Sequence, residues 1–178
     1  MKNVLLINSS PRKNGNSAYL YSIAKEYFCS NGCNVAEIYL PNEELVGCKA
    51  CGYCKKSGKC VSEDNTVNIL NKMRQSDVII MFCPVYFCGF DSHTKKLIDR
   101  SECMYQTKPK TNGKIALVAS FGATLEENYI GMHYGMKYFA YSLKKEYVGI
   151  KPFANTDNLT KELKEQYKQD LLQFIKIL

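Results

Sequence analysis

Short apolar runs alternate with segments of helical periodicity along the chain, and this alternation constrains the fold most. The runs are rich in Val, Ile and Leu, and five of them have the length of strands: residues 4–7, 35–40, 77–82, 115–119 and 147–150. Runs without polar alternation indicate strands that are buried on both faces. Helices between such strands cover both sides of a parallel sheet. The sequence therefore predicts an α/β fold.

The length and spacing of these segments predict a particular topology. A chain of 178 residues has the size of one domain, so we expect a single domain over residues 1–178, with a cysteine-rich insert at residues 47–61 after the second strand. Five strands with this spacing fit a flavodoxin-like, doubly wound parallel sheet in the order 2-1-3-4-5. Ligands of such sheets bind at the carboxyl ends of the strands. The loops after the first, third and fourth strands should therefore meet at one crevice.

Composition and charge narrow the class of protein. An apolar fraction of 46% is typical of a globular chain. The net charge of +7 comes mostly from scattered lysines. The sequence contains no arginine-rich arm of the kind that would indicate a nucleic-acid partner. The first apolar run is too short for a secretory signal, and residues 78–90 are too few to span a bilayer. We expect a cytoplasmic protein without a membrane partner.

The polar loop after the first strand has the features of a phosphate site. It precedes a segment of helical spacing, and a helix N-terminus carries unpaired N–H groups and a partial positive charge. Asn16 or Ser17 is expected to cap that helix. A plain capped turn is the alternative. The side chains that offer hydrogen bonds or charge to a phosphate are Ser9, Ser10, Arg12, Asn16 and Ser17.

Two further loops have the features of a ring-binding site. Tyr86 and Phe87 follow the third strand and can lie against a flat ring, although packing in the core is the commoner role of such aromatics. Ser120-Phe121-Gly122 follows the fourth strand, and its small residues let a ring approach the backbone. One phosphate loop and two ring loops predict a mononucleotide with a planar head, for which FMN is the natural candidate.

Three motifs resemble the NAD(P)H-dependent FMN reductase family of flavodoxin-like proteins. They are Ser10-Pro-Arg…Gly-Asn-Ser17, Pro84-Val-Tyr-Phe87, and Lys95/Lys96…Ile98-Asp-Arg100. The resemblance covers residues 1–150. It implies that the flavin carries the chemistry without a catalytic side chain, that NAD(P)H is a possible donor, and that the protein is a homodimer or homotetramer. An aromatic helix at residues 129–141 fits a subunit interface or ordinary helix packing equally.

The resemblance also implies roles for individual residues. Ser9, Arg12, Asn16 and Ser17 would bind the FMN phosphate. The isoalloxazine would be held by Pro84, Val85, Tyr86 and Phe87. The third loop would contact the ring edge through Ser120, Phe121 and Gly122.

Four of the nine cysteines form a compact motif, Cys48-x2-Cys51-x2-Cys54-x5-Cys60. In a chain without an export signal, cysteines are more often metal ligands, redox groups or small buried hydrophobes than disulfides. Structural zinc usually uses two separated Cys-x-x-Cys knuckles, whereas a continuous x2-x2 run is typical of ferredoxins. Zinc, an iron–sulfur cluster and unliganded thiols therefore all remain open.

A branch of the same family, the iron–sulfur flavoproteins, resembles this chain in carrying such a motif just after the second strand. That resemblance implies a 4Fe–4S cluster on Cys48, Cys51, Cys54 and Cys60. The other five cysteines are predicted to be packing residues: Cys29, Cys33, Cys83, Cys88 and Cys103.

Three functions follow as hypotheses. The leading one is an FMN oxidoreductase that passes electrons between FMN, a 4Fe–4S cluster and a redox partner, such as NAD(P)H or an acidic ferredoxin drawn to the basic surface. The second is a cluster-free NAD(P)H-dependent reductase of flavins or quinones. The third is a non-catalytic zinc-binding module that mediates protein contacts.

Overall fold

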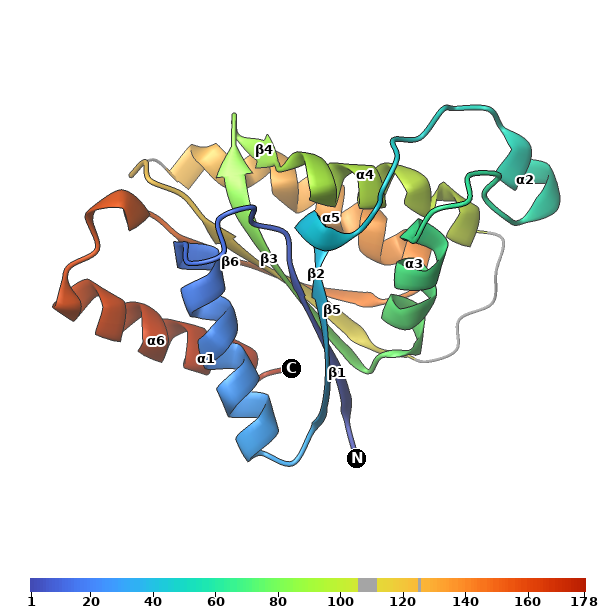
Figure 1. Ribbon diagram of the computed structural model, residues 1–178. Coiled ribbons are helices and arrows are strands. Elements are labelled where there is room, and N and C mark those ends of the chain that lie inside the picture. The colour runs from blue at the N-terminus through green and yellow to red at the C-terminus, as the bar shows by residue number, and fades with distance from the viewer. Residues whose placement is uncertain (106–111, 125) are drawn as a thin grey trace.

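The computed structural model describes residues 1–105, 112–124 and 126–178, and Figure 1 shows a twisted sheet with helices on both sides. The strands are β1 (Asn3–Asn8), β2 (Asn34–Tyr39), β3 (Val78–Tyr86), β4 (Gly89–Phe90), β5 (Lys114–Ser120) and β6 (Glu146–Phe153). The α-helices are α1 (Asn16–Ser30), α2 (Tyr53–Ser57), α3 (Thr66–Gln75), α4 (Ser92–Arg100), α5 (Ile130–Leu143) and α6 (Lys161–Ile175). Short 3-10 turns are η1 (Leu40–Asn42), η2 (Ser101–Met104), η3 (Glu126–Tyr129) and η4 (Thr156–Asn158).

The sheet has the predicted topology. Its main path runs β2-β1-β3-β5-β6, and all neighbours on this path are parallel. These five strands correspond to the five predicted runs, so the order 2-1-3-4-5 is confirmed. The additional strand β4 pairs with β3 in antiparallel fashion. All of the strands therefore belong to one sheet.

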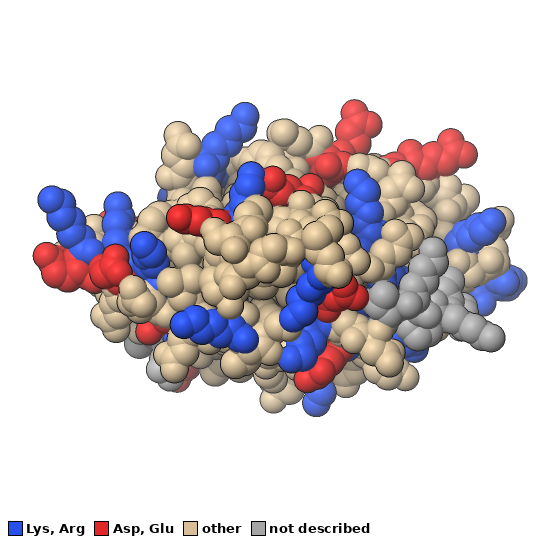
Figure 2. Space-filling view, turned by 90° about the horizontal axis from the view of Figure 1, so that it is seen from below, with Lys and Arg blue, Asp and Glu red and all other residues tan. Residues whose placement is uncertain are grey.

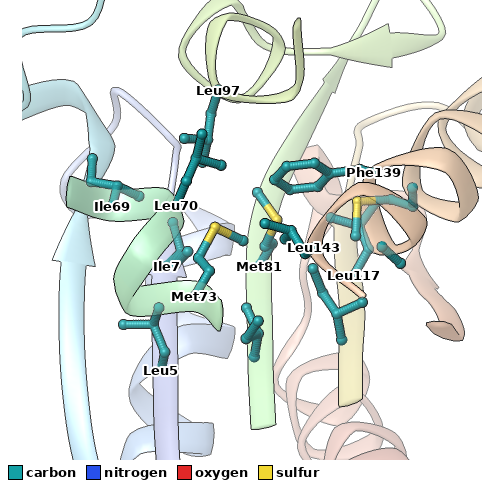
Figure 3. Close-up of a cluster of buried hydrophobic side chains, with 14 of the residues drawn as sticks. Leu5, Ile7, Ile69, Leu70, Met73, Met81, Leu97, Leu117, Phe139 and Leu143 are labelled. Carbon is teal, nitrogen blue, oxygen red and sulfur yellow. The ribbon is translucent and has the colours of Figure 1, made fainter. Parts of the chain in front are cut away.

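Alternate side chains of each central strand enter two separate cores. Leu5 and Ile7 of β1 pack on one face of the sheet with α3, α4 and α5, and Figure 3 shows this core around Met81. Val4 and Leu6 pack on the other face with α1 and α6. Because successive residues of a strand point to opposite faces, a strand covered on both sides must be apolar throughout. This explains the absence of polar alternation in the runs.

The main departure from the expected boundaries lies at the end of β3. We predicted that this strand stops before Pro84, but it continues to Tyr86 and turns back into β4. Phe87 and Cys88 form the turn with φ values of 49° and 59°. Positive φ at both central residues matches the hairpin turn that suits the twist of the strands. The aromatic loop is therefore the tip of a β-hairpin.

The cysteine-rich insert also contains an element without a sequence signature. The short helix α2 lies within it, preceded by Gly52 and followed by Gly58, both with φ of 69°. Glycine tolerates this left-handed conformation at helix ends. Figure 1 shows α2 away from the sheet, at the end of α4 opposite to the β4 hairpin.

Helix α5 packs through one face and exposes aromatic side chains on the other. Its buried residues include Met132, Met136 and Phe139. The exposed residues include Tyr134, Tyr138 and Tyr141. Helix packing accounts for the first set, and the predicted subunit interface remains a prediction.

Charged side chains are mixed on the molecular surface. Figure 2 shows a face on which lysine and arginine side chains are interspersed with aspartate and glutamate. The net charge of +7 is therefore not gathered into one basic patch on this face. Within the described ranges, no helix is both long enough and apolar enough to cross a bilayer.

Candidate functional site

A cavity of about 190 Å³ lies at the carboxyl ends of β1, β3 and β5, and we call it the strand-end cavity. The three loops predicted to converge do line it together. The predicted residues that line it are Arg12, Asn16, Ser17, Pro84, Val85, Tyr86, Ser120, Phe121 and Gly122. The lining also includes Ser10, which was predicted to offer a hydrogen bond to the phosphate, and three residues for which no role was predicted: Gly15, Thr156 and Asp157.

The N-terminus of α1 presents uncapped backbone N–H groups at this cavity. The capping residue is Gly15, not Asn16 or Ser17 as predicted, and no side chain of the described residues accepts a hydrogen bond from the first turn. The Asn16 amide donates to the Thr156 carbonyl (2.9 Å), and the Ser17 and Ser120 hydroxyls lie 2.7 Å apart. The exposed Arg12 side chain forms no ion pair within the part of the chain described. These groups fit an anion at the helix N-terminus.

Ser9 is directed away from the strand-end cavity. Its hydroxyl donates to the carboxylate of Asp91 (2.5 Å), which is buried at the N-cap of α4. Asp91 also accepts from the His93 and Thr94 N–H groups, the Thr94 hydroxyl (2.8 Å) and the Cys83 thiol (3.1 Å). This network joins the β1 loop, β3 and α4. A role of Ser9 at a phosphate remains a prediction.

The two predicted aromatics of the hairpin lie differently. Tyr86 lines the cavity and is partly exposed, whereas the Phe87 side chain is fully exposed at the turn and does not line the cavity. Burial and then the Asp91 carboxylate raise the pKa of the neighbouring Cys83 thiol. Cys83 is therefore a neutral buried thiol, in agreement with the packing role predicted for it.

Thr156 and Asp157 close the cavity from the segment after β6. The Thr156 N–H donates to the Phe121 carbonyl (3.0 Å), which fixes η4 beside the third loop. A Cβ placed on Gly122 would lie 1.9 Å from an Asp157 carboxylate oxygen, so only glycine permits this approach. No motif marks these two residues. The predicted strand order nevertheless places the end of the fifth strand beside the fourth, and this was the available clue.

A second cavity, of about 340 Å³, is lined by all four motif cysteines, and we call it the cysteine cavity. Cys48, Cys51, Cys54 and Cys60 are free thiols there. No three His, Cys, Asp or Glu side chains of the described residues form a group that could hold a single metal ion. A cluster distributes its cysteines over several irons, so it requires thiols around a shared space. The four cysteines meet that requirement.

Cys103 lines the same cavity, which the sequence analysis did not foresee. Its side chain is buried in η2, and its thiol donates to the Arg100 carbonyl (3.2 Å). Burial, followed by the proximity of Cys60 and Cys54, raises the pKa of Cys103 to about 11. Burial, Glu102, Cys60 and Cys48 also raise the pKa of Cys54. Crowded thiols of this kind favour a positive centre that lets them ionise together.

Comparison with known proteins assigns the family. The family model described as NADPH-dependent FMN reductase matches residues 2–130, which is more than half of the chain. The chain belongs to the NADPH-dependent FMN reductase family. Within the family, it is similar to curated proteins named iron–sulfur flavoproteins. The predicted family is confirmed, and the names of these relatives support the predicted branch.

Support for the branch comes from curated relatives of the chain. An iron–sulfur flavoprotein of Methanocaldococcus jannaschii is 38% identical over 120 residues, which cover 66% of this chain and 62% of the relative. An iron–sulfur flavoprotein of Methanosarcina thermophila is 33% identical over 118 residues, with the same coverage of both chains. The matched region is thus less than two thirds of either relative's length.

Solved structures agree with the fold. An NAD(P)H:quinone oxidoreductase from Methanothermobacter marburgensis superposes with a TM-score of 0.72 at 13% identity. The match covers 96% of the present chain and 92% of the oxidoreductase chain. An azoreductase from Bacillus anthracis superposes with a TM-score of 0.68 at 17% identity, over 99% and 98% of the two chains. At these identities the likeness establishes the flavodoxin-like architecture.

Proposed function

We propose that this protein is an FMN-dependent oxidoreductase of iron–sulfur flavoprotein type, which passes electrons between FMN, a 4Fe–4S cluster and a redox partner. The observation that carries the proposal is that all four motif cysteines line one cavity in a chain of the FMN reductase family. We further propose that the protein works in the cytoplasm as a homodimer or homotetramer.

The strand-end cavity suits the phosphate end of FMN. Its volume of about 190 Å³ is below the roughly 300 Å³ at which complete ligand pockets begin. The cavity therefore takes the phosphate, and the flat ring lies beyond it. Arg12 and the N-terminal N–H groups of α1 bind the phosphate. Tyr86 and the backbone at Pro84 and Val85 orient the ring.

Bound FMN exchanges two electrons with a hydride donor and single electrons with a cluster. The residues of this chain bind and orient the flavin, and none of them acts as an acid or a base. In the cysteine cavity, Cys48, Cys51, Cys54 and Cys60 hold the cluster. The exposed Lys49, Lys55, Lys56 and Lys59 of the insert attract an acidic redox partner such as a ferredoxin.

The deciding experiment is an ultraviolet–visible spectrum of protein purified without oxygen, recorded before and after dithionite, with iron and FMN quantified. Flavin bands, a broad brown shoulder and about four irons per chain are expected. One zinc per chain in a colourless protein would instead identify a zinc-binding module.

A cluster-free NAD(P)H-dependent reductase of FMN or quinones is the second candidate. It is favoured by the matching family model, which is described as NADPH-dependent FMN reductase. The same strand-end cavity serves this function. Steady NAD(P)H oxidation by an iron-free preparation that retains FMN would favour this candidate over the first.

A further inference from the structure

The last residue of α4, Arg100, places a buried cation against one of the motif cysteines. Its side chain is 1% exposed, and its Nε donates to the Cys60 sulfur over 3.2 Å. Its two Nη groups bind both carboxylate oxygens of Asp64, at 2.8 and 3.0 Å. They also reach the carbonyls of Val46 (3.0 Å) and Ser62 (3.5 Å). All five N–H donors of the guanidinium are thus used.

These contacts of Arg100 have two different roles. Val46, Ser62 and Asp64 belong to the chain on either side of the motif, so binding them ties both ends of the cysteine-rich insert to α4. The contact with Cys60 adds nothing to that purpose, and a neutral thiol is a poor acceptor. The same contact becomes a strong, charge-assisted hydrogen bond when Cys60 is a thiolate.

We infer that Arg100 is a positioning residue for the cluster: its Nε–H group fixes the Cys60 thiolate as a ligand and raises the reduction potential of the centre that Cys60 binds. The inference rests on the proposed function, because it requires the cluster. Hydrogen bonds to ligand sulfur and local charge both set cluster potentials. Reduction adds one electron to the cluster, and Arg100 keeps its proton throughout because its pKa lies far above the working pH.

Substitution of Asp64 should shift the cluster potential in the opposite direction from substitution of Arg100. Its carboxylate neutralises part of the Arg100 charge at 2.8 Å. In Asp64→Asn the hydrogen bond from Arg100 to Cys60 stays while the negative charge of Asp64 is removed. The reduced state of the cluster is then favoured, and its reduction potential rises. In Arg100→Lys the positive charge stays while the planar fork and its Nε–H group are lost. A purely structural role of Arg100 does not predict two shifts of opposite sign.

The test is an anaerobic redox titration of the whole protein with dithionite as reductant, followed by absorbance and by electron paramagnetic resonance of the reduced cluster. Iron and FMN are quantified for each sample. Wild type, Arg100→Lys and Asp64→Asn are compared. Arg74→Lys is the matched control, because Arg74 is also buried but does not line the cysteine cavity.

The expected result is a lower cluster potential in Arg100→Lys and a higher one in Asp64→Asn, with the FMN potential and the control unchanged. Because Arg100 also ties the insert to α4, a structural role alone could cause loss of iron from Arg100→Lys. If Arg100→Lys loses iron or fails to fold, the Asp64→Asn shift decides. Unchanged cluster potentials in both variants overturn the inference alone. A wild type without iron overturns it together with the proposed function.

Discussion

The two cavities differ in how firmly the chain holds them before any cofactor binds. The strand-end cavity is built on the ends of three paired strands, and the hydrogen-bond network of buried Asp91 secures the loop beside it. The cysteine cavity is built on an irregular insert in which Cys48 and Cys51 are exposed. Arg100 binds Cys60 and the chain on either side of the motif, and so attaches the insert to α4.

This difference indicates two modes of cofactor binding. A site on rigid elements is preorganised and keeps its geometry when empty. A site on a loop of thiols gains its final geometry from the metal centre, because binding and local folding are coupled. Damage to one cavity should therefore leave the other intact, and the predictions below probe the two cavities separately.

The largest expected effect is loss of the cluster on removal of one motif cysteine. Cys51→Ala leaves three motif ligands, so we expect iron and the brown absorbance to disappear. FMN should remain at the wild-type stoichiometry because Cys51 does not line the strand-end cavity. Cys29→Ala, an exposed cysteine outside the motif, is the control. Full iron content in Cys51→Ala would exclude the assigned ligand set, and Cys103 would then be the first alternative ligand to examine.

Removal of the Asp91 carboxylate should destabilise the fold next most strongly. Asp91→Ala leaves the buried Thr94 hydroxyl and the His93 and Thr94 N–H groups without their carboxylate acceptor. Ser9 and Cys83 lose their bond to the carboxylate and keep only backbone carbonyls as acceptors. We expect a loss of about 3 kcal/mol in the free energy of unfolding, measured by urea denaturation. Thr160→Ala removes the cap of the exposed α6 N-terminus and should cost about 1 kcal/mol. Equal losses in the two variants would show that the Asp91 network does not secure the cavity.

Filling the space at Gly122 should weaken FMN binding. In Gly122→Ala the new methyl group meets the Asp157 carboxylate, so the exposed Asp157 side chain must turn away and the lining of the cavity changes. We expect about tenfold weaker binding, equivalent to about 1.4 kcal/mol, by fluorescence titration of the apoprotein. Gly122→Ala/Asp157→Ala should recover part of the loss. Gly47→Ala has open space around it and should bind FMN as the wild type does.

The smallest effect concerns the acid stability of the insert. Although burial opposes ionisation, hydrogen bonds from Arg100, Val46 and Thr66 lower the pKa of Asp64 from 3.8 to about 2. A pKa that is lower in the folded state gives stability that is complete above about pH 4 and is lost as the pH falls through about 2. The stability difference between wild type and Asp64→Asn should therefore narrow by about 1 kcal/mol between pH 6 and pH 3. Urea midpoints at both pH values measure it, and a constant difference would contradict the assigned pKa.

Most of the strand-end cavity could be predicted from the sequence, because parallel strands bring their carboxyl ends to one edge. The loops at Arg12, Tyr86 and Ser120 meet for that reason. Two side chains could not be placed in advance. The orientation of Ser9 depends on Asp91, which is distant in sequence, and the exposure of Phe87 depends on a hairpin turn made without glycine.

The cysteine cavity was less predictable. The spacing of the four motif cysteines indicates that they can share a centre, and the structure places them around one cavity. Two further residues line this cavity: Arg100 at the end of α4 and Cys103 in the turn after it. Arg100 ends the third family motif, but only tertiary packing brings Arg100 and Cys103 to the insert, so no local pattern reveals these contacts.

Helix α4 joins the two regions, and its length has a mechanical consequence. Its N-cap, Asp91, is bound into the loops beside the strand-end cavity, and its last residue, Arg100, is bound to Cys60 (Figure 1). Nine helical residues rise about 14 Å and turn about 100° each. Inserting or deleting one residue within α4 would rotate the guanidinium by about 100° away from the thiol. The length of the helix therefore sets both the distance between the two cavities and their relative orientation.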